Sequence, residues 1–424
     1  DAPLAGLTVV DFAMGWAGPL ASRLLADLGA EVLKIEAGRY PDWWRGVNWT
    51  PEYIEGRLYE NAKGFCALNR GKRGVSVDLT TAAGRELALE LIRRADAVVE
   101  NQAAGVMDKL GLGYEALSAA NPGLVMLSMS AFGTGNAWSD TRAYGSTLEQ
   151  GAGLPSFMGM PGTPPTMYHL AYGDPVGGLF GCAALLTALL ERRRSGRGQY
   201  VNLSMVEAML QFTTPALLQH QIDAAVPLRR GNRHPAFAPH GFYPAAGEDQ
   251  WIAVTVEDHD GFARLARLVG RPQWAGGAAL AEWSRRQPRD DAVRALRAAG
   301  IACAPLLHAE ELFHDPHLEQ AGFYIDLVRE FSGPQRQAGT AIVLDGRRLG
   351  ARAPAPLLGE HSREVLCGRA GLPSERYEAL VREDVITFAP KALRSAMLAS
   401  PSSPAPGTAP KAGPASTPAP PPQP

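Results

Sequence analysis

One segment, residues 172–178, combines a carboxylate with residue types that begin a helix. Asp174 precedes Pro175 and the pair Gly177 and Gly178, and an apolar helical pattern follows. Asp is a preferred N-cap and Pro suits the first helical position, so Asp174 would serve well as a simple cap. That interpretation leaves the glycines unexplained, because each costs about 1 kcal/mol of helix stability relative to Ala. Small residues there would let a ligand approach, which favours a nucleophilic carboxylate beside backbone N–H groups that stabilise an oxyanion.

Basic side chains gather in the loops that should surround such a site. They are Arg45, Arg70, Lys72, Arg73, Lys109 and Arg142. Arg and Lys form charge-assisted hydrogen bonds with phosphate, and a diphosphate with a further ribose phosphate needs several of them. For any single residue of the set, a solvated surface position explains the charge equally well.

The first loop, residues 15–19, reads Gly-Trp-Ala-Gly-Pro and joins an expected strand to an expected helix. Glu36 ends the next strand, as an acid that binds a nucleotide ribose would. A nicotinamide-binding turn has the spacing G-x-G-x-x-G, however, whereas this loop has only G-x-x-G. A tight turn with Pro19 at the first helical position also explains the loop. The pattern therefore disfavours a nicotinamide nucleotide.

Strand and helix patterns alternate along the first 130 residues. Apolar or β-rich segments occur at 7–12, 31–36, 74–79, 97–100 and 124–130, with helical periodicity at 18–28 and 81–95. Such a βαβ series predicts an α/β fold with a Rossmann-like parallel sheet, whose ligands bind beyond the carboxyl ends of the strands. The loops that reach that edge are 13–18, 37–72, 101–108 and 131–145.

The later sequence divides into further units. Two long Gly- and Pro-containing stretches, 37–68 and 133–173, should wall a site, because uncovered loops of that length are usually functional. A strand pattern resumes at 251–256, followed by helical periodicity. We expect the large domain at 1–215, a smaller α+β domain at 225–325, a segment at 326–390 that returns to the large domain, and a tail at 395–424. The tail is rich in Pro and Ala, and we expect it to be disordered.

Composition excludes several classes of protein. The chain has 424 residues, a formal net charge of −2 and 46% hydrophobic residues, as an ordinary globular protein has. Its charge balance suggests no nucleic-acid partner. The longest apolar run, at 175–190, is shorter than the ~20 residues of a bilayer span, so we expect a buried core helix and no membrane association.

Neither the cysteines nor the histidines form a metal-binding pattern. Four cysteines, Cys66, Cys182, Cys303 and Cys367, lie far apart without C-x-x-C spacing. His314 and His317 flank an Asp-Pro turn, and no third ligand is evident. We therefore expect no disulfide framework and no metal ion, and a reducing, cytoplasmic location.

Taken in order, a set of short motifs resembles the class III CoA-transferase family, which includes formyl-CoA transferase, carnitine CoA-transferase and α-methylacyl-CoA racemase. The resemblance covers residues 3–388. The motifs are Pro3-Leu4-Ala5-Gly6-Leu7, Ala17-Gly18-Pro19, the segment 28–36, Asn69-Arg70-Gly71-Lys72-Arg73, Val99-Glu100-Asn101, Asn121-Pro122, Gly173-Asp174, Gly196-Arg197-Gly198-Gln199, Asp315-Pro316 and the segment 356–361. Each motif is weak alone, but their order is specific.

The resemblance implies an interlocked homodimer whose subunits each have a Rossmann-like large domain and a smaller domain. Asp174 matches the family's catalytic aspartate. Its carboxylate would attack an acyl-CoA thioester to form a mixed anhydride, and the released thiolate would then form an aspartyl-CoA thioester. An acceptor carboxylic acid would complete the exchange in reverse. The substrate is thus a coenzyme A thioester, and no permanently bound cofactor is implied.

The same resemblance assigns roles around Asp174. Trp16 and Ala17 should lie beside the reacting thioester, and Asn101 near the pantetheine arm. Lys72, Arg73 and Lys109 should contact CoA phosphates, and Arg142 occupies a position that is often basic. Two departures concern Ala37, where some relatives have an Arg for the nucleotide, and Gly145, where some have a Glu near the active site.

Alternative functions remain to be weighed. Racemisation of a 2-methylacyl-CoA needs a second acid/base on the opposite face of the α-carbon, which racemase relatives supply as a His. Ala143 stands at that position, so the sequence disfavours a racemase. An intramolecular CoA-transferase fits every residue named. A non-catalytic CoA-binding paralogue is disfavoured by the retained Asp174, and a nicotinamide protein by the missing glycine pattern.

The acids exchanged are predicted only as a class. Arg142 and the rings of Trp43, Trp44, Tyr144 and Tyr168 suggest a pocket with aromatic walls and a cation. We therefore expect a dicarboxylate or an aromatic acid, with succinyl-CoA as an example of the donor.

Overall fold

A six-stranded parallel sheet forms the centre of the computed structural model, which describes residues 2–47, 49–167, 170–225, 229–271, 277–350 and 353–391. Its strands are β1 (Thr8–Asp11), β2 (Glu31–Glu36), β3 (Arg73–Ser76), β4 (Ala97–Glu100), β5 (Val125–Ser130) and β6 (Gln199–Ser204). The order β3-β2-β1-β4-β5-β6 reverses between β1 and β4. This order is that of a doubly wound sheet, which confirms the Rossmann-like prediction.

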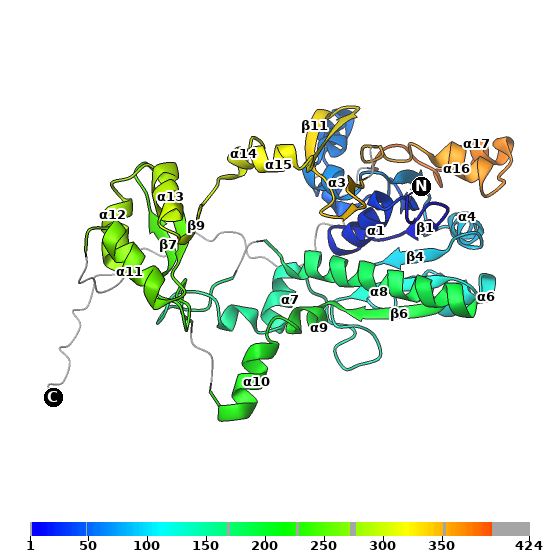
Figure 1. Ribbon diagram of the computed structural model, residues 1–424. Coiled ribbons are helices and arrows are strands. Elements are labelled where there is room, and N and C mark those ends of the chain that lie inside the picture. Colours follow the sequence, from blue (N-terminus) through cyan, green and yellow to red (C-terminus); the bar gives the residue numbers. More distant parts are fainter. Residues whose placement is uncertain are drawn as a thin grey trace, which may run out of the picture.

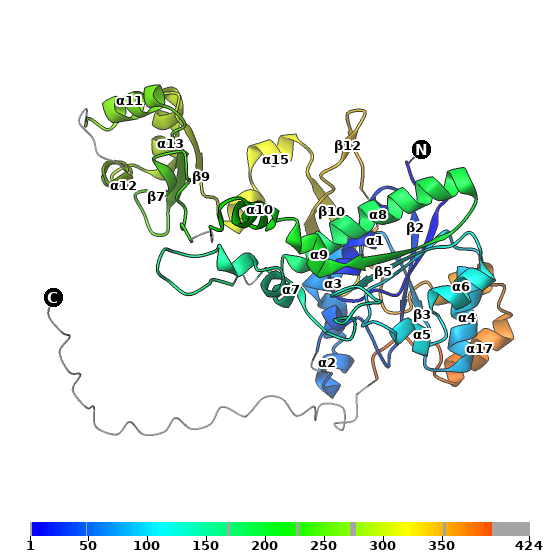
Figure 2. The ribbon, with the colours of Figure 1, turned by 90° about the horizontal axis from the view of Figure 1, so that it is seen from below.

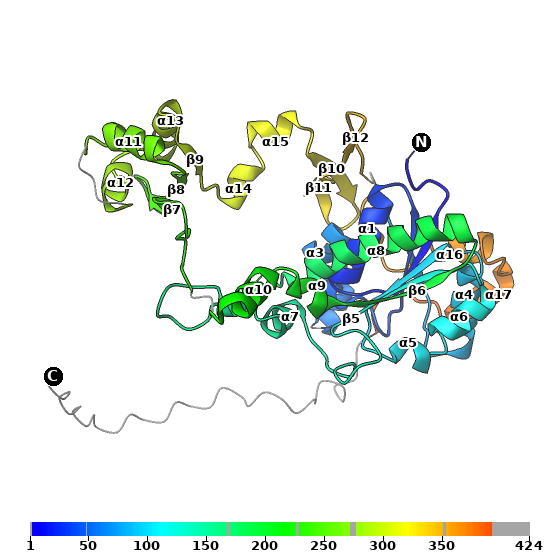
Figure 3. The same cartoon turned by 60° about the horizontal axis from the view of Figure 1, so that its bottom comes forward.

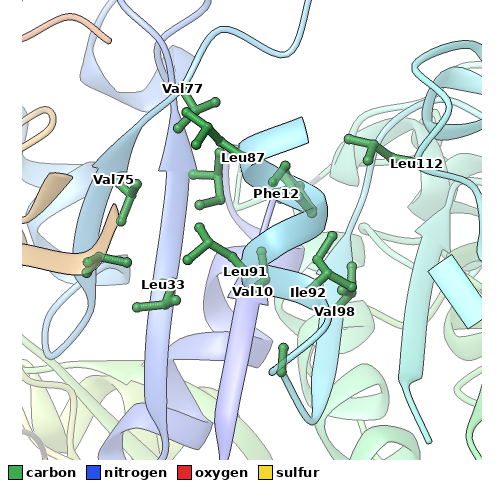
Figure 4. Packing of buried hydrophobic residues seen from close by; sticks show 14 of the residues in the cluster. Val10, Phe12, Leu33, Val75, Val77, Leu87, Leu91, Ile92, Val98 and Leu112 are labelled. Atoms are coloured by element: carbon green, nitrogen blue, oxygen red, sulfur yellow. The ribbon is translucent and has the colours of Figure 1, made fainter. Parts of the chain in front are cut away.

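Successive residues of each inner strand pack against opposite layers of helices, as the two-residue period of a strand requires. Val9 and Val32 face α1 (Ala17–Asp27), α8 (Gly173–Ser195) and α9 (Met205–Leu210). Val10 and Leu33 face α4 (Ala82–Ile92) and α6 (Tyr114–Ala120), and Figure 4 shows them next to α4. Figure 2 shows the two layers on either side of the sheet.

Helix α8 is long and apolar enough to resemble a membrane span, and among the described residues it alone passes that test. It lies along the sheet and packs against α1, α9 and β5 (Figure 1). Its buried stripe includes Gly181, Cys182 and Leu185. The helix therefore belongs to the core of the large sheet, as the sequence predicted.

The end of the described chain returns to this sheet. Helices α16 (Ser362–Gly368) and α17 (Ser374–Arg382) join the same apolar cluster as α4. The Ser362 hydroxyl accepts a hydrogen bond from the N–H of Ser76 in β3 at 2.9 Å. Residues nearly 300 positions apart in the sequence thus pack in the same hydrophobic core.

A second, smaller sheet has a core of its own. Antiparallel strands β7 (His240–Pro244), β8 (Trp251–Thr255) and β9 (Ala302–Pro305) pack against α11 (His259–Leu268), α12 (Gly277–Ser284) and α13 (Arg289–Ala298). Figures 1 and 3 show this unit apart from the six-stranded sheet, with α14 (Ala309–Leu312) and α15 (Pro316–Gln320) between them. Two hairpins follow, β10 (Tyr324–Arg329) with β11 (Gly333–Ala338), and β12 (Val343–Leu344) with β13 (Arg347–Arg348).

The two stretches expected to be long loops contain short helices. The first holds η1 (Trp43–Arg45), α2 (Pro51–Glu55), η2 (Leu58–Asn61) and α3 (Lys63–Leu68), and the second holds α7 (Gly145–Gly151) and η3 (Leu154–Ser156). The remaining helices are α5 (Val106–Lys109) and α10 (Thr214–Asp223). The prediction of uncovered loops is thus wrong in detail, because these turns are held by contacts with distant parts of the chain.

Candidate active site

Asp174 lies in the first turn of α8 without capping it. Tyr172 occupies the N-cap position, and among the described residues no side chain caps the helix. The Asp174 carboxylate instead accepts a hydrogen bond from the backbone N–H of Gly145. Burial raises the pKa of Asp174 to about 6, with the Gly145 N–H opposing and the Glu149 charge adding to the rise. The group is therefore mostly ionised at neutral pH but poorly solvated, as suits a nucleophile.

Two glycines allow α7 to meet the start of α8. A Cβ on Gly145 would lie 2.4 Å from Oδ2 of Asp174, and a Cβ on Gly173 would lie 2.6 Å from the carbonyl oxygen of Gly145. Neither position has room for a side chain. Glu149 of α7 reaches back and accepts the N–H of Tyr172 at 2.5 Å. The start of α8, with Asp174, is thus held by α7, which sequence patterns did not predict as a helix.

Gly177 and Gly178 serve helix packing, which corrects the expectation that they give a ligand access. A Cβ on Gly178 would lie 2.7 Å from the carbonyl oxygen of Ala17 and 3.0 Å from the Leu20 side chain. A Cβ on Gly177 would lie 3.0 Å from the side chain of Met205. Both glycines are buried, so they bring α8 close to α1 and α9. Ala17 is fully buried in the same contact.

The first loop is braced by polar side chains from three other segments. Asn101 both donates to the carbonyl oxygen of Met14 and accepts its N–H, each at 2.8 Å. Asp42 accepts the N–H of Gly15 at 3.0 Å and pairs with the buried Lys34 ammonium at 2.9 Å. These bonds fix the turn that presents Trp16 beside the start of α1.

A row of aromatic rings connects this loop to the neighbourhood of Asp174. Ring centroids are 5.3 Å apart for Trp16 and Trp44, 5.9 Å for Trp43 and Trp44, and 6.1 Å for Trp43 and Tyr144. Tyr144 immediately precedes Gly145. Trp43 and Tyr144 are 43% and 73% exposed, so part of this row is open to a ligand. Tyr168, which the sequence suggested for the same wall, lies outside the described residues.

A cavity of about 440 Å³ opens at the carboxyl ends of β1 to β4. Its apolar lining includes Phe12, Ile35, Val77, Leu79, Met107 and Leu110, and its rim includes Arg39, Thr80 and Gln102. The volume lies within the range of ~300–1,000 Å³ that is typical of small-molecule sites. Trp43 borders both this cavity and the aromatic row. Arg39 was missed from the sequence, although it follows the position of Ala37 by only two residues.

Lys72 and Arg73 lie away from this cavity, which corrects their assignment to CoA phosphates. Lys72 is 2% exposed, and its ammonium pairs with Asp11 at 2.9 Å. Arg73 begins β3 at the opposite edge of the sheet and pairs with Glu31 and Glu364. Both are structural cations.

The other basic residues fall into two groups, buried cations in ion pairs and exposed cations. Arg45 and Arg70 are buried in ion pairs with Glu36 and Asp27. Lys109 is exposed at the end of α5, which borders the cavity, and Arg142 is exposed two residues before Tyr144. The structure therefore places Arg39 at the cavity and Lys109 on a helix that lines it, whereas Arg142 is near the aromatic row only along the chain.

The small-molecule cavity, the aromatic row and the poorly solvated Asp174 carboxylate together form the candidate active site. Residues 4–362 match the model of CoA-transferase family III, and the chain belongs to that family. It is thus a CoA-transferase, whose substrates are CoA thioesters, and the resemblance inferred from the sequence is confirmed.

Relatives support the same class. The succinate–glutarate CoA-transferase of Agrobacterium fabrum is 30% identical over 387 residues, which cover 86% of this chain and 95% of that protein. The succinyl-CoA–D-citramalate CoA-transferase of Chloroflexus aurantiacus is 29% identical over 401 residues, 91% of this chain and 98% of that protein. A crystal structure of a CAIB/BAIF family protein from Brucella suis has a TM-score of 0.77 at 29% identity, covering 87% of this chain and 99% of that one.

Proposed function

We propose that the enzyme transfers CoA from an acyl-CoA to a carboxylic acid through covalent intermediates on Asp174. The observation that carries this proposal is the half-buried Asp174 carboxylate, bonded to the Gly145 N–H, at the start of α8. Its raised pKa indicates that it lacks the solvation that would quench its reactivity. Its partner Gly145 directly follows Tyr144, the ring that ends the aromatic row leading to the cavity.

The exchange needs no redox step and no net proton transfer. An Asp174 oxygen attacks the thioester carbonyl carbon, the carbon–sulfur bond breaks, and the electron pair leaves on the CoA sulfur. The thiolate then attacks Cγ of Asp174 in the mixed anhydride and releases the donor carboxylate. The acceptor carboxylate attacks the aspartyl-CoA thioester, and the same two steps run in reverse. The protein supplies positioning and stabilisation of the oxyanions.

We infer that CoA lies with its nucleotide in the 440 Å³ cavity and its thioester toward Asp174. Arg39, Lys109 and Arg142 are exposed cations that suit its phosphates. Asn101 and Trp16 border the intervening loop, which supports their proposed places near the pantetheine arm and the thioester. Crystals grown with CoA test this arrangement, and phosphates bound at Lys72 or Arg73 would contradict it.

The acids exchanged are proposed to be dicarboxylates, with succinyl-CoA as donor. Relatives are named for succinate, glutarate and citramalate. The exposed Trp43 and Tyr144 rings and the Arg142 cation suit a chain with a second carboxylate. Succinyl-CoA and acetyl-CoA would be offered with a panel of acids and the CoA products resolved by mass. Acceptance of monocarboxylates only would contradict the proposal.

Two alternatives to intermolecular CoA transfer are intramolecular transfer and racemisation. An intramolecular transfer between two carboxyls of one diacid uses the same residues, and transfer between isotopically labelled molecules distinguishes it. A racemase needs an acid/base where Ala143 stands, and loss of a 2-methylacyl α-deuteron to solvent would support it.

The enzyme is also proposed to be an interlocked, cytoplasmic homodimer, with its large unit made of 1–215 and 326–390 and its small unit of 225–325. Helix α10 has no buried residue, and its Leu217, Leu218 and Ile222 are exposed. A second subunit would cover such a face. The four cysteines are unpaired, in keeping with a reducing compartment. Light scattering that gives the mass of one chain would contradict the dimer.

A further inference from the structure

Glu149 is a buried acid whose second carboxylate oxygen has no hydrogen-bond partner in the described part of the chain. The residue is 1% exposed. Its Oε1 accepts the N–H of Tyr172 at 2.5 Å, but within the described part of the chain no group bonds to its Oε2. A buried carboxyl with an unsatisfied oxygen carries a cost in folding free energy, so its presence calls for an explanation.

The explanation lies in the contact between α7 and the start of α8. Glu149 holds Tyr172, the N-cap residue of α8, while the N–H of Gly145, four residues earlier in α7, bonds to Asp174. The two hydrogen bonds run in opposite directions between the same segments. Together they set where the Asp174 side chain begins and where its oxygens point.

Glu149 also acts on Asp174 through its charge. Among the described residues, it is the charged side chain that perturbs Asp174, and its effect is to disfavour the ionised form. The neighbours from α1 and α9 at this end of α8 are apolar, namely Ala17, Leu20 and Met205. The phenols of Tyr144 and Tyr172 are the other titratable groups adjoining this turn in the chain.

We propose that Glu149 is a positioning residue that fixes the first turn of α8 and whose buried charge favours acylation of Asp174. The proposal rests on the function proposed above. When an Asp174 oxygen bonds to the acyl carbon, the carbon–sulfur bond breaks and the negative charge leaves on sulfur. The repulsion between the two carboxylates is then relieved, so the like charge promotes the step.

Glu149→Gln tests the charge while keeping an oxygen that accepts the Tyr172 N–H. Exchange of label between succinyl-CoA and ¹³C-succinate is measured against pH. We expect the acid limb of the pH–rate profile, where the rate falls as Asp174 is protonated, to move to lower pH. The rate on the plateau above this limb should fall about tenfold, equivalent to about 1.4 kcal/mol. Glu207→Gln on α9, which removes an exposed charge, should change neither quantity. An unchanged limb and rate in Glu149→Gln would overturn the inference.

Glu149→Asp serves as the second variant. It keeps the charge but withdraws the oxygen from Tyr172, so the acid limb should stay near that of the wild type although the fold is less stable. A limb displaced as far as in Glu149→Gln would contradict the role of charge.

A double-mutant cycle, measured by thermal unfolding, separates this inference from the proposed function. Asp174→Asn should raise the melting temperature at pH 7.5 more in the wild type than in Glu149→Gln, because the second background lacks the repulsion. This comparison needs no catalysis. Equal gains in both backgrounds would overturn the coupling between the two carboxylates. Wild-type exchange by Asp174→Ala would instead overturn the proposed function, and with it the role of Glu149 in acylation, while the measured coupling would stand.

Discussion

The backbone N–H of Gly145 donates to the Asp174 carboxylate, and Gly145 lies so close that an added Cβ would fall 2.4 Å from Oδ2 of Asp174. The same Cβ would lie 2.6 Å from the carbonyl oxygen of Ala171, which is backbone and cannot easily move. The position of the Asp174 carboxylate therefore depends on a residue without a side chain.

Replacing Gly145 should consequently impair catalysis before it impairs folding. In Gly145→Ala we expect the carboxylate to be displaced and kcat to fall about 100-fold, the loss that a ~1 Å misplacement of reacting groups causes. The matched control is Gly151→Ala at the other end of α7, where the Cβ would meet the side chains of Val206 at 3.3 Å and Phe132 at 3.7 Å and no backbone atom as close. Steady-state exchange with both variants checks this, and full activity in Gly145→Ala would refute the described geometry.

The pH dependence of the reaction should report the ionisation of Asp174. Its pKa is raised to about 6, and only the carboxylate form attacks the thioester. We therefore expect kcat/KM to be constant above that pH and to fall tenfold per unit below it. A profile measured from pH 4.5 to 8.5 provides the check. An acid limb near pH 4 would show that Asp174 is well solvated, contrary to the structure.

The same pKa predicts that the nucleophile destabilises the fold. Because the folded pKa lies above the unfolded one, the folded protein binds more protons between about pH 4 and pH 6, and stability is lost as pH rises through this window. The rise from 3.8 to about 6 corresponds to about 3 kcal/mol. Asp174→Asn should gain up to that amount in free energy of unfolding at pH 7.5 and nothing below about pH 4.

Urea unfolding at several pH values measures this gain. Asp140→Asn, at an exposed position, is the control and should leave stability unchanged. A loss of stability in Asp174→Asn at neutral pH would mean that the carboxylate has a structural role after all.

Binding of CoA should depend on Arg39 and not on Arg73. Arg39 lies at the rim of the cavity, whereas Arg73 pairs with Glu31 at the opposite edge of the sheet. We expect Arg39→Ala to raise KM for acyl-CoA about tenfold, since one charge-assisted bond is worth about 1.5 kcal/mol. Arg73→Ala should lower the melting temperature without changing KM. The reverse pattern would relocate the nucleotide.

The main sheet could be predicted from local patterns because its strands and helices carry their own periodicity. The helix expected at 18–28 spans Ala17–Asp27, and that expected at 81–95 spans Ala82–Ile92. Helix α7 could not be found in this way, since seven residues with two glycines have little intrinsic helix stability. Its position depends on contacts with α8.

Site residues were predictable only where residue type alone decides their role. Asp174 was proposed because of the glycines that follow it, although those glycines serve packing. Lys72 was misassigned because its partner Asp11 is 61 residues away, a pairing that no local pattern reveals. Glu149 gave no signal at all, since an acid within an amphipathic segment is normally solvated.

Trapping the covalent intermediate tests the central claim most directly. The enzyme would be incubated with succinyl-CoA, treated with borohydride and digested, and the peptides compared by mass with those of Asp174→Ala. A reduced side chain at residue 174, absent when acyl-CoA is omitted, is the predicted result. An unmodified Asp174 in enzyme that is turning over, or equal labelling of the Asp174→Ala variant, would contradict it.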